Sequence, residues 1–123
     1  MNDNVETWKP IEGYEDLYEV SNWGRIRSID RYIPVKAGGK RLFKGKIKTA
    51  IKNSNNGYLQ IMLVRSCVFK LFYVHRLVAA AFVDNPYQLK CVIHINGNLA
   101  ENRAANLKFV DRSWRKNKEL NLI

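Results

Sequence analysis

The sequence predicts an α+β protein in which an N-terminal antiparallel β module precedes a compact unit of two strands and a helix. Three observations predict this class. Short apolar runs separated by glycine and asparagine turns fill the first 73 residues. Apolar residues recur at helical spacing only in "VHRLVAAAFV". A strand, a glycine turn and a returning strand then lead to a basic final stretch. We expect the β module to span residues 1–52 and the second unit residues 53–123.

The N-terminal half reads as short strands. In "ETWKPIEGYEDLYEVSNWGRIRSID", turns are expected at Gly13 and at residues 22–24, and "RIRSI" alternates basic and apolar residues, as a half-buried strand does. The stretch "YIPVKAGGKRLFKGKIKTAIKN" continues in this style around a loop at residues 37–39. The Asn56-Gly57 pair predicts a turn before the strand "YLQIMLV", which we expect to pair with "SCVFKLFYV".

The last third has a different order of elements. The spacing of Leu77, Val78, Ala81 and Phe82 predicts a helix from about His75 to Phe82, ended by "DNPYQ" with its proline. The stretch "LKCVIHI" is expected to be a strand, "NGN" a turn and "LKFV" the returning strand. The basic stretch "RSWRKNKEL" predicts a closing helix.

Composition excludes several classes of protein. In 123 residues no apolar run approaches the roughly 20 residues of a membrane helix, so no membrane partner is expected. The start "MNDNVETWKP" is polar and acidic, unlike a signal peptide. Cys67 and Cys91 form no Cys-x-x-Cys pair, which favours two reduced, partly buried thiols over a zinc site.

The net charge of +10 is unevenly distributed. Six acids and one lysine precede Val20, whereas residues 25–52 hold ten Lys/Arg and the single acid Asp30. This sorting indicates a surface for a polyanion, and we expect double-stranded DNA. Membrane-surface binding is the competing interpretation, but it needs an apolar helical stripe, and the glycines and proline of this segment argue against a helix.

His94 is the candidate catalytic residue. It ends a predicted strand, where a side chain is held rigidly, and histidine suits general-base work near neutral pH. The asparagines that follow can lock the connecting loop through bonds to their own backbone. The alternative is that His94 is a hydrogen-bonded core residue with no catalytic role.

Three motifs carry a family resemblance. The stretch "VIHINGNLAENRAANLKFV" resembles the signature of HNH endonucleases, and "YVHRLVAAAF" resembles the helix that precedes it in phage and intron-encoded homing endonucleases. The stretch "WKPIEGYEDLYEVSNWGRIRSI" is similar to the nuclease-associated modular domain found beside such units. The resemblance implies a ββα-metal (HNH-type) unit, a phage or mobile-element origin, and so the cytoplasm of a bacterial host cell.

The resemblance also implies roles for single residues. His94 matches the general base that activates water, and Asn106 matches the asparagine that ties the loop to the strands and orients the histidine. Gly97 and Asn98 match the turn. His75, on the upstream helix, is expected to be a packing or phosphate-contact residue.

A divalent metal, Mg²⁺ or Mn²⁺, is implied by the same resemblance. The family places an acidic ligand just before the base, where this chain has Ile93, which cannot coordinate a cation. The second ligand falls at Arg115, nine residues past Asn106, with Asn117 as a substitute if the preceding loop has slipped by two residues.

Two functions therefore remain open. The first is an HNH-type DNA endonuclease that hydrolyses or nicks phosphodiester bonds, and the second is a DNA-binding or regulatory protein on a degenerate HNH scaffold. An inhibitor that mimics a nuclease surface is a third reading, which the cationic charge disfavours. In the first two readings the same residues are expected on DNA: Arg25, Arg27, Lys40, Arg41, Lys44, Lys46, Lys48, His75, Arg76, Arg112, Arg115 and Lys116.

Overall fold

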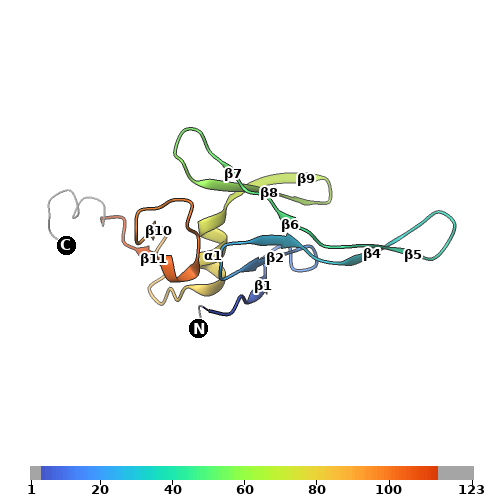
Figure 1. The fold of residues 1–123 in the computed structure, drawn as a ribbon, viewed down its shortest axis with the longest axis horizontal. Helices are drawn as coiled ribbons and strands as arrows, with labels where there is room; N and C mark the ends of the chain where they lie inside the picture. Colours follow the sequence, from blue (N-terminus) through green and yellow to red (C-terminus); the bar gives the residue numbers. More distant parts are fainter. Residues whose placement is uncertain (1–3, 114–123) are drawn as a thin grey trace.

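The computed structural model describes residues 4–113 and has a mixed α+β fold dominated by antiparallel strands. Figure 1 shows a long β-hairpin at one end, the α-helix near the middle and a small β-sheet at the other end. The elements in chain order are β1 Trp8–Pro10, β2 Tyr18–Ser21, β3 Ile26–Ser28, β4 Arg31–Pro34, β5 Lys40–Phe43, β6 Ile47–Lys48, β7 Ile51–Lys52, β8 Leu59–Arg65, β9 Val68–Tyr73, α1 Val74–Phe82, β10 Cys91–His94, the 3₁₀ turn η1 Ala104–Asn106 and β11 Leu107–Val110.

The N-terminal sheet has the strand order β1-β2-β3-β6, and all its neighbours are antiparallel. Alternation along β2 and β3 buries Val20 and Ile26, which are register partners, on the side that faces the core. The β4–β5 hairpin extends from this sheet and buries none of its residues. It therefore contributes surface and no core.

The second sheet has the order β7-β8-β9. The β8–β9 hairpin is closed by Ser66 and Cys67, whose φ angles of 50° and 64° are those of a tight two-residue turn. Tyr18 joins the two sheets because its hydroxyl accepts a hydrogen bond from the Val64 amide at 3.2 Å. The sheets are therefore connected through one buried tyrosine as well as through apolar packing.

Helix α1 packs on both sheets and on β10–β11, with Val74, Val78, Ala79 and Phe82 buried. These side chains join one hydrophobic cluster that also draws on β2, β3, β8, β10 and β11. At the last turn of the helix, the Lys9 ammonium donates to the Ala81 carbonyl oxygen at 3.0 Å. A positive charge at a helix C-terminus is favourable because the last carbonyls carry partial negative charge.

Asn22, in the turn between β2 and β3, is fully buried and connects three segments. Its side-chain oxygen accepts from the Thr7 amide at 2.7 Å, and its side-chain nitrogen donates to the Val5 carbonyl at 3.0 Å. Its own carbonyl accepts from the Ala104 amide at 2.8 Å. The N-terminal segment, the β2–β3 turn and η1 are thus held by one asparagine, a residue whose burial requires such partners.

Most predicted elements are confirmed. The helix expected at His75–Phe82 begins one residue earlier, "LKFV" is β11, and "SCVFKLFYV" supplies β9, which pairs with β8. The Asn56-Gly57 turn is present, with Gly57 at φ +79°. The closing helix falls mostly on residues 114–123, outside the described part of the chain.

Two further sequence predictions concern the cysteines and the membrane. Both cysteines are free, but the expectation of partial burial is wrong for Cys67, which is exposed because it lies at the tip of a hairpin. Within residues 4–113, the one α-helix has nine residues and is too short to cross a bilayer.

Candidate active site

His94 is the last residue of β10, where it pairs with Leu107 of β11 in antiparallel register. The chain turns immediately afterwards, because the Gly97 amide donates to the His94 carbonyl at 2.9 Å and Gly97 takes a φ of +78°. A glycine adopts this left-handed conformation without steric cost. The predicted strand end and glycine turn are therefore both present.

Asn106 ties the connecting loop to itself. Its side-chain nitrogen donates to Asn96 Oδ1 at 3.0 Å and to the Glu101 carbonyl at 2.9 Å. Its side-chain oxygen accepts from the Asn96 amide at 3.1 Å. Because one amide group bridges both ends of the loop, its removal would leave at least three bonds unmade.

Asn102 is the residue that contacts the candidate base. Its Oδ1 lies 2.7 Å from His94 Nε2, and both side chains are buried, at 5% and 7% exposure. The other ring nitrogen, His94 Nδ1, is buried with no hydrogen-bond partner among the described residues. One side of the imidazole is therefore fixed, and the other has an unused polar atom.

The rings of Tyr58 and His75 lie next to the ring of His94. The His75 ring centroid is 4.9 Å from that of His94, and Tyr58 stacks on His75 at 4.7 Å and on His94 at 5.9 Å. Burial, the neighbouring His94 and Arg76 lower the pKa of His75 from its ordinary value of 6.5 to about 4. His75 is therefore neutral near pH 7, as a packed imidazole beside a second one should be.

A pocket of about 490 Å³ opens beside these rings. It is bordered by Tyr58 and His75 but not by His94 itself, whose exposure is low because its ring neighbours cover it. The charge around the pocket is mainly positive, as a phosphate site requires. Its lining comprises Tyr58, Tyr73, His75, Arg76, Lys90, Cys91, Val92, Ile93, Val110, Asp111 and Arg112.

The described residues do not fit the divalent metal that the resemblance implies. Ile93, at the position of the acidic ligand, is half-buried on the pocket wall and offers only hydrocarbon. Within residues 4–113 there is no group of three or more His, Cys, Asp or Glu side chains able to hold a metal ion. Arg115, Lys116 and Asn117 lie outside the described residues.

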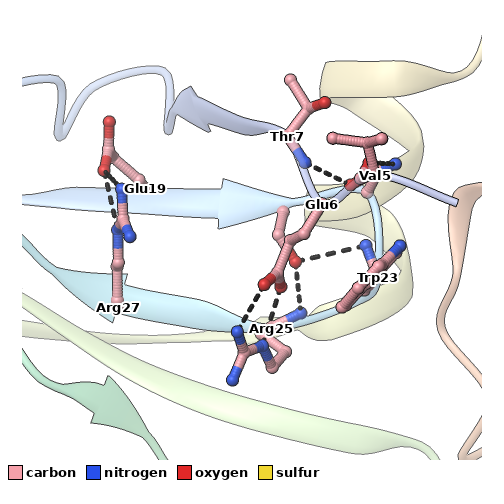
Figure 2. A network of polar contacts seen from close by, with 9 residues as sticks. Val5, Glu6, Thr7, Glu19, Trp23, Arg25 and Arg27 are labelled. Atoms are coloured by element: carbon pink, nitrogen blue, oxygen red, sulfur yellow. Dashed lines mark hydrogen bonds and ion pairs between the residues drawn. The ribbon is translucent and has the colours of Figure 1, made fainter. Parts of the chain in front are cut away.

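The predicted DNA-contacting residues separate into two sets. Arg25 and Arg27 bind carboxylates: Arg25 Nε donates to Glu6 at 2.7 Å, and Arg27 Nε donates to Glu19 at 2.9 Å (Figure 2). The Arg27 guanidinium also lies 3.9 Å over the Trp8 ring. These arginines hold β1, β2 and β3 together as well as presenting charge.

The second set consists of cations that make no ion pair with a carboxylate within residues 4–113. No ion pair to another residue of the range 4–113 is made by the side chains of Lys40, Arg41, Lys44, Lys46 and Lys48. The first four are exposed, whereas Lys48 is half-buried. Near the pocket, Arg76 donates to the Lys90 carbonyl at 2.9 Å, and Arg112 is exposed on the pocket rim.

Sequence reasoning missed Asn102 and Tyr58, two of the residues whose side chains contact His94. Asn102 is one of several asparagines between Cys91 and Val110, and its sequence position does not distinguish it from the others. Tyr58 is 36 positions before His94 and reaches it only through the fold. No local pattern could have identified either residue.

Comparison with known proteins gives matches along most of the chain. The family model described as NUMOD4 motif matches residues 6–64. The DNA endonuclease I-HmuI of Bacillus phage SP01 is 38% identical over 103 residues, which are 84% of this chain and 51% of that protein. An uncharacterized HNH endonuclease, L247, of Acanthamoeba polyphaga mimivirus is 35% identical over 118 residues, which are 92% of this chain and 26% of that protein.

A solved structure is also similar. The structure described as DNA binding and cleavage by the HNH homing endonuclease I-HmuI superposes with a TM-score of 0.73 at 32% identity. The match covers 94% of this chain and 59% of the other. This chain therefore spans about half the length of I-HmuI and about a quarter of the mimivirus relative.

Proposed function

Because the chain is a homologue of HNH homing endonucleases and carries a NUMOD4 motif, we propose that it binds double-stranded DNA and cuts phosphodiester bonds with His94 as general base. The observation that carries the proposal is the placement of His94 at a strand end, next to a cation-rimmed pocket. The homologous phage protein is named a DNA endonuclease, and its structure is described as one of DNA binding and cleavage.

The proposed reaction uses the unpartnered nitrogen of His94. A water molecule gives its proton to Nδ1 while its oxygen forms a bond to phosphorus, the bond to the leaving oxygen breaks, and that oxygen takes a proton from solvent. Nδ1 is covered in the described structure, so water must reach it past the Tyr58 and His75 rings. The mobility of these rings is therefore part of the proposal.

In this proposal the two parts of the chain have different roles, one in DNA binding and the other in DNA cutting. Residues 1–52 would bind the duplex through their exposed cations, and residues 53–123 would form the ββα-type cutting unit. Lys40, Arg41, Lys44 and Lys46 support the first assignment because they are exposed and make no ion pair within residues 4–113. Arg76 and Arg112 support the second because they border the pocket.

A divalent metal remains a family expectation. In HNH endonucleases such an ion stabilises charge on the phosphate and on the leaving oxygen. The donor set of residues 4–113 does not fit such an ion. A titration with Mg²⁺ or Mn²⁺ in a DNA-nicking assay decides whether either ion is needed.

The second candidate is a protein that binds DNA without cutting it. Two observations favour it: Ile93 replaces the acidic ligand, and His94 is 7% exposed. In this alternative the basic surface binds DNA and His94 has no catalytic role. It predicts that binding is unaffected by substitution of His94.

A nicking assay separates the two candidates. Supercoiled plasmid and phage DNA are incubated with Mg²⁺ or Mn²⁺ and with wild type, His94→Ala or Ile93→Asp, and binding is measured in parallel. The proposed nuclease nicks DNA, and His94→Ala lowers the rate by about 10²-fold or more, the share that general-base catalysis usually supplies. Binding by wild type with no nicking in either metal contradicts the nuclease, and a gain of nicking in Ile93→Asp identifies the missing carboxylate as the cause.

A further inference from the structure

The contact between Asn102 and His94 determines where the imidazole carries its proton. An amide oxygen can only accept a hydrogen bond, so the 2.7 Å contact from Asn102 Oδ1 requires a proton on His94 Nε2. In a neutral ring the other nitrogen, Nδ1, then holds a lone pair. That is the form a general base needs, and within residues 4–113 Nδ1 is the ring atom without a partner.

The same contact changes strength when His94 takes up a proton. The Nε2–H donor then belongs to a cation, and hydrogen bonds from charged donors are shorter and stronger than neutral ones. Because both side chains are buried, at 5% and 7% exposure, solvent screens this gain only weakly. Asn102 would therefore stabilise the protonated ring that forms as water is deprotonated.

The position of Asn102 depends on the N-terminal motif. Gly24, in the β2–β3 turn, lies so close that a Cβ atom built on it would be 2.8 Å from the Asn102 carbonyl oxygen. The Ala104 amide, two residues past Asn102, donates to the Asn22 carbonyl of the same turn at 2.8 Å. The turn at residues 21–25 therefore packs directly on the backbone that presents the Asn102 amide to His94.

From these contacts we infer that Asn102 is a positioning residue, which fixes the Nε2–H tautomer of His94, and that the Ser21–Arg25 turn of the NUMOD4 motif holds Asn102 in place. The catalytic consequence rests on the proposed function, because it assumes that His94 acts as base. The N-terminal motif then has a second role besides DNA contact: it supports the backbone segment that carries Asn102.

The tautomer can be measured without DNA or metal. Nitrogen-15 NMR of the histidine ring in the full chain should show a protonated Nε2 and an unprotonated Nδ1 for His94 near neutral pH. Asn102→Ala should remove this preference and give a mixture of the two tautomers. A wild-type spectrum with the proton on Nδ1 would mean that the Asn102 amide donates instead of accepting, and the inference would be overturned.

A charge at position 102 gives a second readout. In Asn102→Asp a carboxylate faces Nε2–H and favours the imidazolium, so the acid limb of ring titration, and of nicking, should move up by about one to two pH units. His75 and Tyr58, the titratable groups that face the ring from α1 and the turn before β8, are unchanged in this variant. Ser66→Asp adds the same charge at the tip of the β8–β9 hairpin and should leave the titration in place. Equal shifts in both variants would contradict a direct contact.

Substitutions at two glycines test whether the Ser21–Arg25 turn holds Asn102 in place. Gly24 and Gly13 have φ angles of +89° and +87°, so alanine is equally strained at either position. Only Gly24→Ala meets Asn102, because nothing lies within 4 Å of a Cβ at Gly13. Gly24→Ala should therefore disturb the His94 tautomer and slow nicking about tenfold more than Gly13→Ala, given the sensitivity of catalysis to small misplacements. Identical spectra and rates in the two variants would show that the turn does not position Asn102.

The outcomes separate this inference from the proposed function. If the protein binds DNA without cutting it but shows the Nε2–H tautomer, which disappears in Asn102→Ala, the positioning contact stands and the nuclease proposal fails. If it cuts DNA through His94 while Asn102→Ala alters neither the spectrum nor the rate, the nuclease stands and the positioning role fails. Asn102→Ala is expected to lower the nicking rate by about 10²-fold.

Discussion

Two parts of one basic run in the sequence have different environments in the structure. Arg27, on β3, is bound to Glu19 and stacked on Trp8, whereas the basic hairpin segment, defined as residues 31–46, has six Lys/Arg and no acid. In the first region the charge holds three strands together, while in the second it lies on a projecting hairpin (Figure 1). Positive charge in a sequence therefore indicates a binding surface only where acids are absent from the neighbouring strands as well.

The largest effect should come from removing the unpaired cations. Substitution of Lys40, Arg41, Lys44 and Lys46 by alanine should weaken DNA binding on the order of 10²–10³-fold at about 0.1 M salt. The slope of log affinity against log salt should fall by about 0.9 for each phosphate that the variant no longer neutralises, and so by up to roughly 3.6. Fluorescence anisotropy with labelled duplex across a salt series measures both quantities.

The control for this variant is its own stability. These four side chains are exposed and make no ion pair within residues 4–113, so the melting temperature should be unchanged. Binding that stays at the wild-type level with an unchanged salt slope would mean that the hairpin does not touch DNA, and its unpaired charge would then have no role in binding.

An effect of intermediate size is expected for Arg27→Ala, which should change stability and leave the salt dependence of DNA binding unchanged, the reverse of the hairpin variant. This variant lacks an ion pair and a cation–π interaction and should be less stable by about 1 kcal/mol, while its salt slope stays close to wild type. Lys46→Ala is the matched control, whose slope should fall by about 0.9 with no change in stability. Chemical denaturation gives the free energy of unfolding and salt-dependent binding gives the slope. A weaker Arg27→Ala complex with an unchanged unfolding midpoint would show that Arg27 reaches a phosphate.

The smallest expected effect is on the stability of the protein at acidic pH. The hydrogen bond from Arg25 lowers the pKa of Glu6 below its ordinary value of 4.5. A carboxyl whose folded pKa is depressed stabilises the protein above its unfolded pKa, and this contribution disappears as pH falls through the folded value. The melting temperature of wild type should therefore fall below about pH 4.5 more steeply than that of Glu6→Gln.

A matched variant confines this acid effect to the paired region. The hairpin variant without Lys40, Arg41, Lys44 and Lys46 keeps Glu6 and Arg25, so its stability should decline in acid as that of wild type does. Parallel melting curves for wild type and Glu6→Gln between about pH 3 and 6 would show that this ion pair does not contribute. The titration of His75 acts mainly between its ordinary value of 6.5 and about 4, and it is common to all these variants.

Much of the fold could be predicted because it rests on short-range patterns. The helix at Val74–Phe82, the Gly57 turn and the strand Leu107–Val110 are set by periodicity or by turn residues within a few positions of each other. His94 at a strand end before a glycine turn is also local. For these features the sequence contains both the residues and the spacing that position them.

The candidate site was only half predictable because its contacts are distant in the chain. Eight positions separate His94 from Asn102, and 36 separate it from Tyr58. The pairing of Arg25 with Glu6, 19 positions apart, likewise depends on how β1 lies beside β2 and β3. Side chains so far apart in the sequence meet only after the sheets have packed. Neither composition nor net charge predicts which of them will meet.

The sequence by itself determined the class of the fold, the local turns, the surplus of positive charge and the identity of the imidazole at the strand end. The tertiary structure alone decided that the β2–β3 turn presses on Asn102, that Asn102 holds His94, and that only some of the cations of residues 4–113 stay unpaired. The physical reason is that periodicity and turn propensity act over a few residues, whereas a hydrogen bond or an ion pair forms wherever folding brings a donor within about 3 Å of an acceptor.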